Sequence, residues 1–212
     1  MIIINFKNYK FGNEALNLAK KIKKYLPKAI ICPATADIWQ ISQNTKLAVY
    51  AQHVSSLEGN RNTGFDLPES IKSAGASGTL LNHSEHKIPF SQIKKSLAKL
   101  SKLKLKVIVC VSSLREAKKI SRFHIKPYAI AFEDPKLIST GKSITQYNPK
   151  TIKKFVKILG NKNIIQLCGA GINSTQDVIK AKLFGCKGVL IASAIANSKN
   201  PVPLLKKIKK FY

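Results

Sequence analysis

Three side chains that can take part in proton transfer stand just beyond short apolar stretches of the sequence. Lys7, His83 and Glu133 each lie within two residues of the end of such a stretch. A carboxylate base, an imidazole and a fixed ammonium group together suit the abstraction of a proton next to a carbonyl. Each residue alone is a weak signal, because lone histidines are more often structural and lysines are abundant here. The set therefore points to chemistry only if the three stretches end at the same place in the fold.

Two segments of small residues also follow apolar stretches. They are Gly169-Ala170-Gly171 and Ala192-Ser193. Small residues let the backbone approach a ligand closely, and N–H groups at the start of a helix attract anions. Ser174 is followed three residues later by Asp177, a spacing that resembles a capping box and predicts a helix beginning near Ser174. We therefore expect these segments to hold a phosphate group.

The elements that would position these residues are eight short apolar runs alternating with lysine-rich amphipathic segments. Continuous apolar runs are typical of parallel strands covered on both faces. An example of the intervening helices has Ile152, Phe155 and Leu159 on one face, with Asn148-Pro149 as expected N-cap and first helical residue. The expected strands are Ile2–Phe6, Ala29–Cys32, Leu47–Ala51, Gly78–Leu81, Lys106–Val111, Tyr128–Phe132, Ile164–Leu167 and Gly188–Ile191.

Eight β/α units in 212 residues leave little room except for a closed barrel with tight connections. We therefore predict an α/β fold: a single (β/α)8 barrel domain over residues 1–212, with an eight-stranded parallel core. A doubly wound open sheet is the alternative. In a barrel, functional residues lie in the loops after the carboxyl ends of the strands. Lys7, His83 and Glu133 would then meet at one end.

The composition indicates a globular protein of the cytoplasm. No apolar run approaches the roughly 18 residues that span a bilayer, and the apolar start of the chain is too short for a signal peptide. The four cysteines sit in apolar surroundings with no CxxC spacing, so we expect buried, reduced thiols, and no metal or cofactor.

The formal net charge of +27 is unusual. Arginine occurs only at 61, 115 and 122, so 34 of the 37 basic residues are lysine, and they are spread through every expected helix. This favours solvated helix faces over a nucleic-acid surface, and we expect neither a nucleic-acid nor a membrane partner. The positive field should attract an anionic substrate and should depress the pKa of His83.

Several ordered motifs resemble triosephosphate isomerase, in its shorter archaeal-type branch, over essentially the whole chain. They are Asn5-Phe6-Lys7 with Tyr9, Ala51-Gln52-His53-Val54, Thr63-Gly64 with Leu67-Pro68-Glu69, Thr79–Glu85, Ala131-Phe132-Glu133 with Leu137–Gly141, Leu167–Ile172 and Gly188–Ser193.

The resemblance implies an aldose–ketose isomerase that interconverts D-glyceraldehyde 3-phosphate and dihydroxyacetone phosphate in glycolysis and gluconeogenesis. Glu133 would move the proton, neutral His83 would polarise the carbonyl and Lys7 would stabilise the oxyanion, a pairing of base and imidazole for which this family is itself the standard example. Segment 134–142 would form a lid, and the family forms oligomers, with tetramers favoured in this branch. The other residues implied to bind substrate or support the site are Asn5, Phe6, Glu85, Ile138, Ser139, Gly171, Ala192 and Ser193.

The sequence departs from the family at Asp134, where a proline usually follows the glutamate, and at Ser139, His86 and Ala194. These changes bear on the lid more than on the chemistry. His53 is expected to pack or to lie at an interface. Two alternatives stay open: another phosphate-binding barrel enzyme such as an aldolase, and a basic binding protein that has lost catalysis.

Overall fold

A computed structural model of the chain describes residues 1–137, 140, 142–160 and 162–211. Its core is a closed barrel of parallel strands in the order β1-β2-β3-β4-β5-β6-β7-β8, which confirms the barrel and excludes the open sheet. The strands are β1 Ile2–Asn5, β2 Ile30–Cys32, β3 Ala48–Ala51, β4 Gly78–Leu81, β5 Lys106–Val111, β6 Ala129–Phe132, β7 Ile165–Cys168 and β8 Gly188–Ile191. The barrel closes where Ile3 of β1 pairs with Leu190 of β8.

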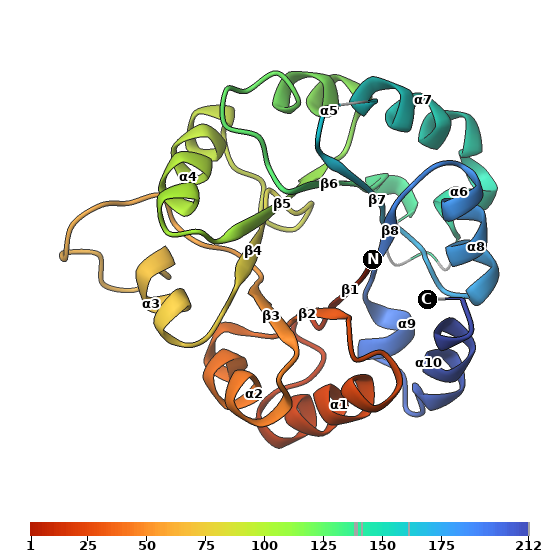
Figure 1. Cartoon of the computed structure of the whole chain (residues 1–212), viewed down its shortest axis with the longest axis horizontal. Coiled ribbons are helices and arrows are strands. Elements are labelled where there is room, and N and C mark those ends of the chain that lie inside the picture. Colours follow the sequence, from red (N-terminus) through yellow and green to blue (C-terminus); the bar gives the residue numbers. More distant parts are fainter. Residues whose placement is uncertain (138–139, 141, 161, 212) are drawn as a thin grey trace.

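Helices form a ring around the barrel (Figure 1). They are α1 Gly12–Tyr25, α2 Ile38–Thr45, α3 Pro68–Ser73, α4 Phe90–Lys102, α5 Leu114–Ile120, α6 Ile144–Tyr147, α7 Pro149–Leu159, α8 Thr175–Leu183, α9 Ser193–Ala196 and α10 Val202–Lys209, with short 3₁₀ helices at Thr35–Asp37 and Pro135–Leu137. Among the described residues, no helix combines the length and the apolar character needed to cross a membrane.

The helix starts follow their local sequence. Ser174 caps α8 by accepting the backbone N–H of Asp177, whose carboxylate accepts the backbone N–H of Ser174, so the predicted capping box is confirmed. Asn148 does occupy the N-cap of α7, with Pro149 as the first helical residue. Its side chain makes no capping hydrogen bond, however, so that part of the expectation is wrong.

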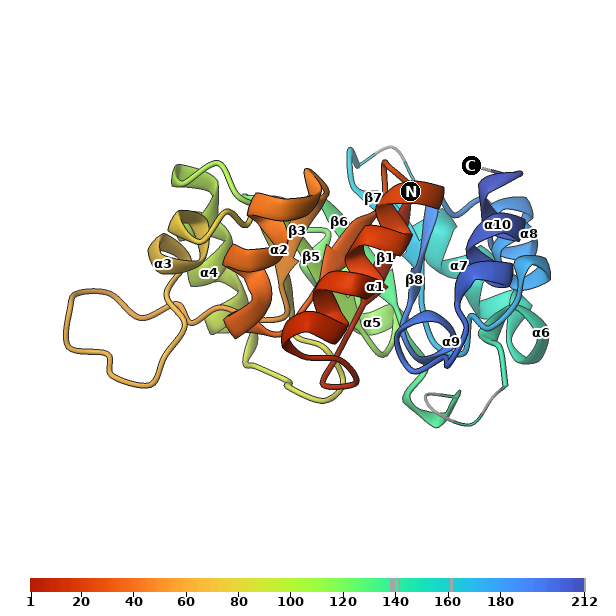
Figure 2. The same cartoon turned by 90° about the horizontal axis from the view of Figure 1, so that it is seen from below.

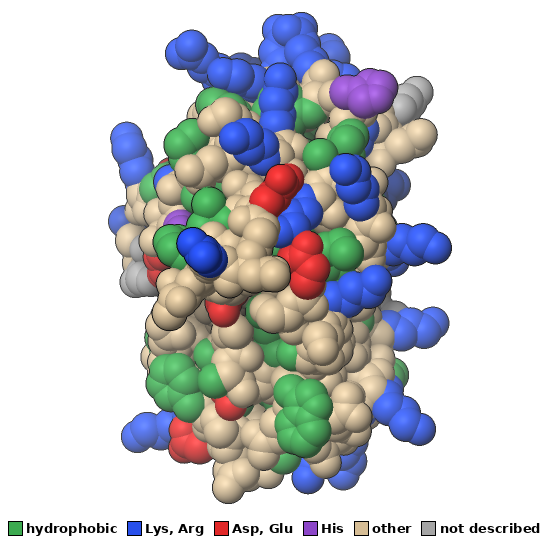
Figure 3. Space-filling model, turned by 90° about the vertical axis from the view of Figure 1, so that its left-hand side faces the viewer, with side chains coloured by type: hydrophobic (Ala, Val, Ile, Leu, Met, Phe, Trp, Pro, Cys, Tyr) green, Lys and Arg blue, Asp and Glu red, His purple; other side chains and the backbone are tan. Residues whose placement is uncertain are grey.

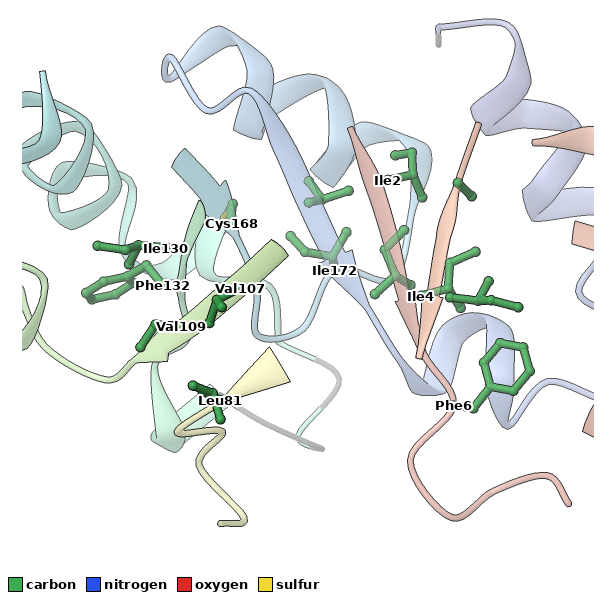
Figure 4. Packing of buried hydrophobic residues seen from close by; sticks show 14 of the residues in the cluster. Ile2, Ile4, Phe6, Leu81, Val107, Val109, Ile130, Phe132, Cys168 and Ile172 are labelled. Carbon is green, nitrogen blue, oxygen red and sulfur yellow. The ribbon is translucent and has the colours of Figure 1, made fainter. Parts of the chain in front are cut away.

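Two packed layers of side chains stabilise the barrel. Outward-facing strand residues such as Val109, Ile130 and Phe132 pack beneath the helices (Figure 4), and the Phe132 ring lies 5.3 Å from that of Phe155 on α7. The inward-facing residues, among them Tyr50, fill the barrel as a separate cluster. All four cysteines are free and buried, as expected.

The two ends of the barrel are different. The amino terminus and the end of α10 lie at one end of the barrel, and the described residues that follow β6 lie at the other (Figure 2). This second end collects the segments that follow the carboxyl ends of all eight strands, and we call it the catalytic end. The end with the helix-to-strand connections and the amino terminus is called the opposite end.

Candidate active site

A pocket of about 150 Å³ opens at the catalytic end of the barrel. Five strands contribute to it, β1, β4, β6, β7 and β8: Asn5 lies in β1 and Leu190 in β8, and the other lining residues lie in the segments that follow the strands. Its lining is Asn5, Lys7, His83, Glu133, Ala170, Gly171, Ile172, Asn173, Leu190, Ala192 and Ser193. The barrel therefore brings together the three chemical side chains and the two small-residue segments that the sequence singled out.

Glu133 is a buried carboxylate with an unpartnered oxygen. Its backbone N–H donates to the carbonyl of Val111 (2.9 Å), which holds it at the end of β6. Its side chain is 8% exposed, Oε2 lies 3.6 Å from His83 Nε2, and that oxygen accepts no hydrogen bond within the described structure. A buried polar atom without a hydrogen-bond partner is costly in free energy, so this oxygen is a candidate for contact with a ligand in the pocket.

Gly169 makes the position of Glu133 possible. A Cβ atom on residue 169 would stand 2.6 Å from Glu133 Cγ, well inside van der Waals contact. The sequence analysis placed this glycine only in a small-residue segment expected to hold phosphate. Its function in the structure is to give the carboxylate space.

His83 is fixed by a tight turn after β4. Asn82, at φ 58°, donates its amide to the Cys110 carbonyl (2.8 Å) and accepts the backbone N–H of Ile88 (3.1 Å). The backbone N–H of Glu85 points at His83 Nδ1 (3.2 Å). Because Nδ1 accepts this hydrogen bond, the geometry assigns a neutral ring with its proton on Nε2, facing Glu133.

The electrostatic surroundings of His83 correct one expectation. Burial lowers the pKa of His83, but the nearby carboxylates of Glu133 and Glu85 outweigh it, and the pKa lies above its usual 6.5. The expectation that the net charge depresses this pKa is wrong, because the two nearby carboxylates act more strongly than distant, screened lysines. The backbone N–H of Glu85 nevertheless requires an unprotonated Nδ1, because a protonated Nδ1 could not accept its hydrogen bond.

Lys7 is held in an unfavourable backbone conformation, at φ 46°. Its N–H donates to Asn5 Oδ1 (2.9 Å), and its carbonyl accepts from the Gln52 amide (2.8 Å), which also reaches the Cys32 carbonyl (3.1 Å). Its ammonium group pairs with Glu85 Oε1 at 2.6 Å. Strain of this kind persists only where neighbours enforce it, and at a site it sets a side chain in place. Gln52 therefore positions Lys7, a function the sequence analysis did not assign.

A buried carboxylate anchors the loop after β7. Asp177 accepts hydrogen bonds from the backbone N–H groups of Asn173 and Ser174 and from the hydroxyl of Thr145 in α6 (2.9 Å). Burial alone would raise the pKa of Asp177, but these bonds and that of Ser143 lower it below its usual 3.8. Asp177 thus ties the small-residue loop to α6, which follows segment 134–142.

The remaining predicted residues differ in where they lie. Phe6 is fully buried in the layer between barrel and helices and does not line the pocket, so its expected contact with substrate is not supported by its position. Glu85 is largely exposed but contacts both Lys7 and His83. Ile138 and Ser139 fall outside the described residues.

Asp134 takes a local structural position at the start of segment 134–142. Its carboxylate accepts the backbone N–H of Lys136 (3.1 Å), and its carbonyl accepts that of Leu137 (3.0 Å). The aspartate therefore caps the short 3₁₀ turn that begins at Pro135, so its side chain has a partner in the turn.

Among the residues that the structure describes, no group of three or more His, Cys, Asp or Glu side chains is placed to hold a metal ion. The fold and the pocket thus define a barrel protein with an acid–base site: a carboxylate facing a neutral imidazole, an ammonium beside them and small-residue loops at the rim.

The comparisons with known proteins agree with this class. Residues 1–210 match the family profile of triosephosphate isomerase. The triosephosphate isomerase of Saccharolobus solfataricus is 40% identical over 208 residues, which cover 95% of this chain and 91% of the relative. That of Methanocaldococcus jannaschii is 35% identical and covers 100% of this chain and 99% of the relative. The chain belongs to the triosephosphate isomerase family, an isomerase family of glycolysis.

Proposed function

We propose that the protein interconverts D-glyceraldehyde 3-phosphate and dihydroxyacetone phosphate through an enediolate. One observation carries the proposal: the unpartnered Oε2 of Glu133 faces the Nε2 edge of His83 at 3.6 Å in a pocket that Lys7 also lines. This arrangement supplies a base, a hydrogen-bond donor for an oxygen and a positive charge, which are the groups that proton transfer next to a carbonyl requires.

In the proposed reaction, Glu133 takes a proton from one carbon of the bound triose, and the C–H electron pair forms the enediolate double bond. His83 donates its Nε2 hydrogen bond to the carbonyl oxygen and passes a proton between the two oxygens. Lys7 stabilises the negative charge that develops there. Glu133 then returns its proton to the neighbouring carbon, so that no atom is gained or lost.

The phosphate group of the substrate is assigned to the small-residue rim. Gly171, Ala192 and Ser193 line the same pocket as Glu133, and Ile138 and Ser139 are included from the resemblance alone. Gly171 has φ 67°, and a Cβ there would overlap the carbonyl of Lys142, so the loop can pass close to the lid segment only with glycine. This close passage supports a lid that covers the phosphate.

The aldolase alternative is disfavoured by the strands. A Schiff-base lysine would stand on a strand inside the barrel, but among the residues that the structure describes the only strand lysine is Lys106, the exposed first residue of β5 at the opposite end. Assembly into a homotetramer and a cytoplasmic location are proposed from the family resemblance. The protruding segment 55–67 (Figures 1 and 2), which exposes Leu57 and Phe65, supports contact with a second copy.

The proposed function is tested by a coupled assay of the purified protein with glyceraldehyde 3-phosphate. The Glu133→Asp variant keeps the charge but withdraws it by about 1 Å, which should lower kcat on the order of a hundredfold with little change in stability. Absence of isomerase activity in the folded wild-type protein would refute the function. Near-normal turnover of the variant would remove Glu133 from the mechanism.

A further inference from the structure

The acidic residues of this protein are all at one end of the barrel. The chain has 10 acidic residues against 37 basic ones. Every acidic residue lies in a strand-to-helix connection or in the first turn of the helix that follows it, and so at the catalytic end. They are Glu14, Asp37, Glu58, Asp66, Glu69, Glu85, Glu116, Glu133, Asp134 and Asp177.

The opposite end carries cations without any acidic side chain between them. Figure 3 shows Lys and Arg side chains projecting in a row from the right-hand edge of the molecule, whereas acidic side chains lie toward the middle and left. The helix-to-strand connections and the segment after α10 hold Lys28, Lys46, Lys104, Arg122, Lys126, Lys162, Lys187 and Lys210. No carboxylate side chain at this end is available to neutralise them.

Helix dipoles explain only part of this segregation. They favour acidic residues in first turns and basic residues in last turns. They do not explain the cations in the connections themselves. Lys46 and Lys104 have φ 53° and 58°, a left-handed conformation that glycine or asparagine usually occupies. Local backbone preference therefore disfavours lysine at these two positions.

A recess lies within the same cationic end. It has a volume of about 370 Å³, and it is lined by Met1, Ile2, Tyr25, Leu26, Pro27, Lys28, Ala29 and Lys209. The ring of Tyr25 has two ammonium groups near it, Lys24 at 5.8 Å and Lys206 at 5.9 Å from its centroid. An apolar, aromatic-walled hollow surrounded by lysines combines a stacking surface with phosphate-binding charge.

We propose that the opposite end of the barrel binds single-stranded nucleic acid, with phosphates along the ring of lysines and an unpaired base in the Tyr25 recess. Stacking of bases on aromatic side chains and a basic surface along the backbone are the two elements of sequence-tolerant single-strand binding. A duplex offers no unstacked base to such a recess. A flat bilayer surface is also a poor partner, because the apolar atoms of the recess lie inside a hollow that such a surface does not enter.

This proposal reverses the expectation drawn from the sequence. Spread along the chain, the lysines suggested solvated helix faces. The fold instead places one group of these cations, in the helix-to-strand connections and after α10, at the end of the barrel that carries no acidic side chain. The proposal uses none of the residues of the isomerase site, so it can be tested independently of the proposed function.

The test variant removes three cations of the opposite end: Lys28→Gln, Lys46→Gln and Lys187→Gln together. Lys28 lines the recess, and the carbonyl of Lys187 accepts a hydrogen bond from the amino terminus of Met1, which also lines it. Binding of a fluorescein-labelled polyuridine strand is measured by anisotropy between about 50 and about 200 mM salt. Loss of three phosphate contacts should weaken binding about tenfold or more and reduce the salt slope by about 2.

The matched control removes the same charge elsewhere: Lys20→Gln, Lys95→Gln and Lys154→Gln, all exposed on outer helix faces. Both triple variants carry a formal charge of +24, three less than +27. The control should bind like wild type, and both variants should keep wild-type isomerase activity, which shows that they are folded. Equal loss of binding in the two variants would overturn the proposal, because net charge alone would then explain it.

A second pair of variants tests the recess. Tyr25→Leu keeps an apolar side chain but removes the stacking surface, so binding should weaken about tenfold with the salt slope unchanged. Tyr25→Phe should bind like wild type. Unchanged binding by Tyr25→Leu, or wild-type protein that sediments with phosphatidylserine vesicles but does not bind the oligonucleotide, would refute the proposed partner.

Discussion

The site geometry predicts that one added methyl group at Gly169 disables the base. In Gly169→Ala the new Cβ would stand 2.6 Å from Glu133 Cγ. Carbon atoms in contact prefer about 3.5 to 4.0 Å, so one partner must move by about 1 Å. The backbone of residue 169 is held by its hydrogen bond to the Phe132 carbonyl (2.9 Å), so the side chain of Glu133 is the group that moves.

The expected effect is on turnover. A base displaced by about 1 Å loses on the order of a hundredfold in kcat, which is about 2.7 kcal/mol in the activation free energy. Overpacking should lower the free energy of unfolding by about 1 to 3 kcal/mol, which leaves the protein folded at room temperature. The assay compares kcat at saturating triose phosphate with the melting temperature of the same preparation.

A double variant separates displacement of the carboxylate from other effects. If Gly169→Ala and Glu133→Asp both act by misplacing the same carboxylate, their losses in kcat should not multiply. If the loss in kcat of the double variant equalled the product of the two single losses, Gly169→Ala would be acting on something other than the Glu133 carboxylate. A kcat within about threefold of wild type in folded Gly169→Ala would refute the steric reasoning. The activation free energy would then lack the increase expected when the base is displaced by about 1 Å.

Other residues give further expectations. His83→Gln should be nearly inactive, because an amide donates a hydrogen bond but cannot relay a proton between oxygens; normal turnover would contradict the role. Asp177 has a lowered pKa in the folded protein, so its stabilising effect should be full well above its usual pKa of 3.8 and be lost as pH falls through the lower folded value. Denaturant unfolding of wild type and Asp177→Asn should therefore converge at low pH; a constant difference would contradict this. His53 stacks on His86 at 4.0 Å, and burial and that neighbour lower its pKa to about 4. Because the unfolded chain binds the proton first, wild type should lose stability from about pH 6.5 down to about pH 4. His53→Gln should remove that loss, and identical pH profiles for the two proteins would count against it.

The sequence determined the strands and the chemical groups. Each apolar run became a strand within one residue of its expected bounds, because continuous β-branched stretches fit a sheet buried on both faces. Lys7, His83 and Glu133 were identifiable because parallel strands in a barrel deliver their carboxyl ends to one place. The Ser174–Asp177 capping box needed only local spacing.

Only the tertiary structure decided how these groups are held. Gln52 reaches Lys7 across 45 residues of sequence, and Gly169 makes space for a side chain on the neighbouring strand. Phe6 adjoins Lys7 in the chain but turns into the packed layer. The separation of acidic from basic ends likewise exists only once helices and strands alternate in one direction around a closed barrel. Local periodicity specifies which face of an element is apolar, whereas contacts between elements depend on register and closure, which no local pattern encodes.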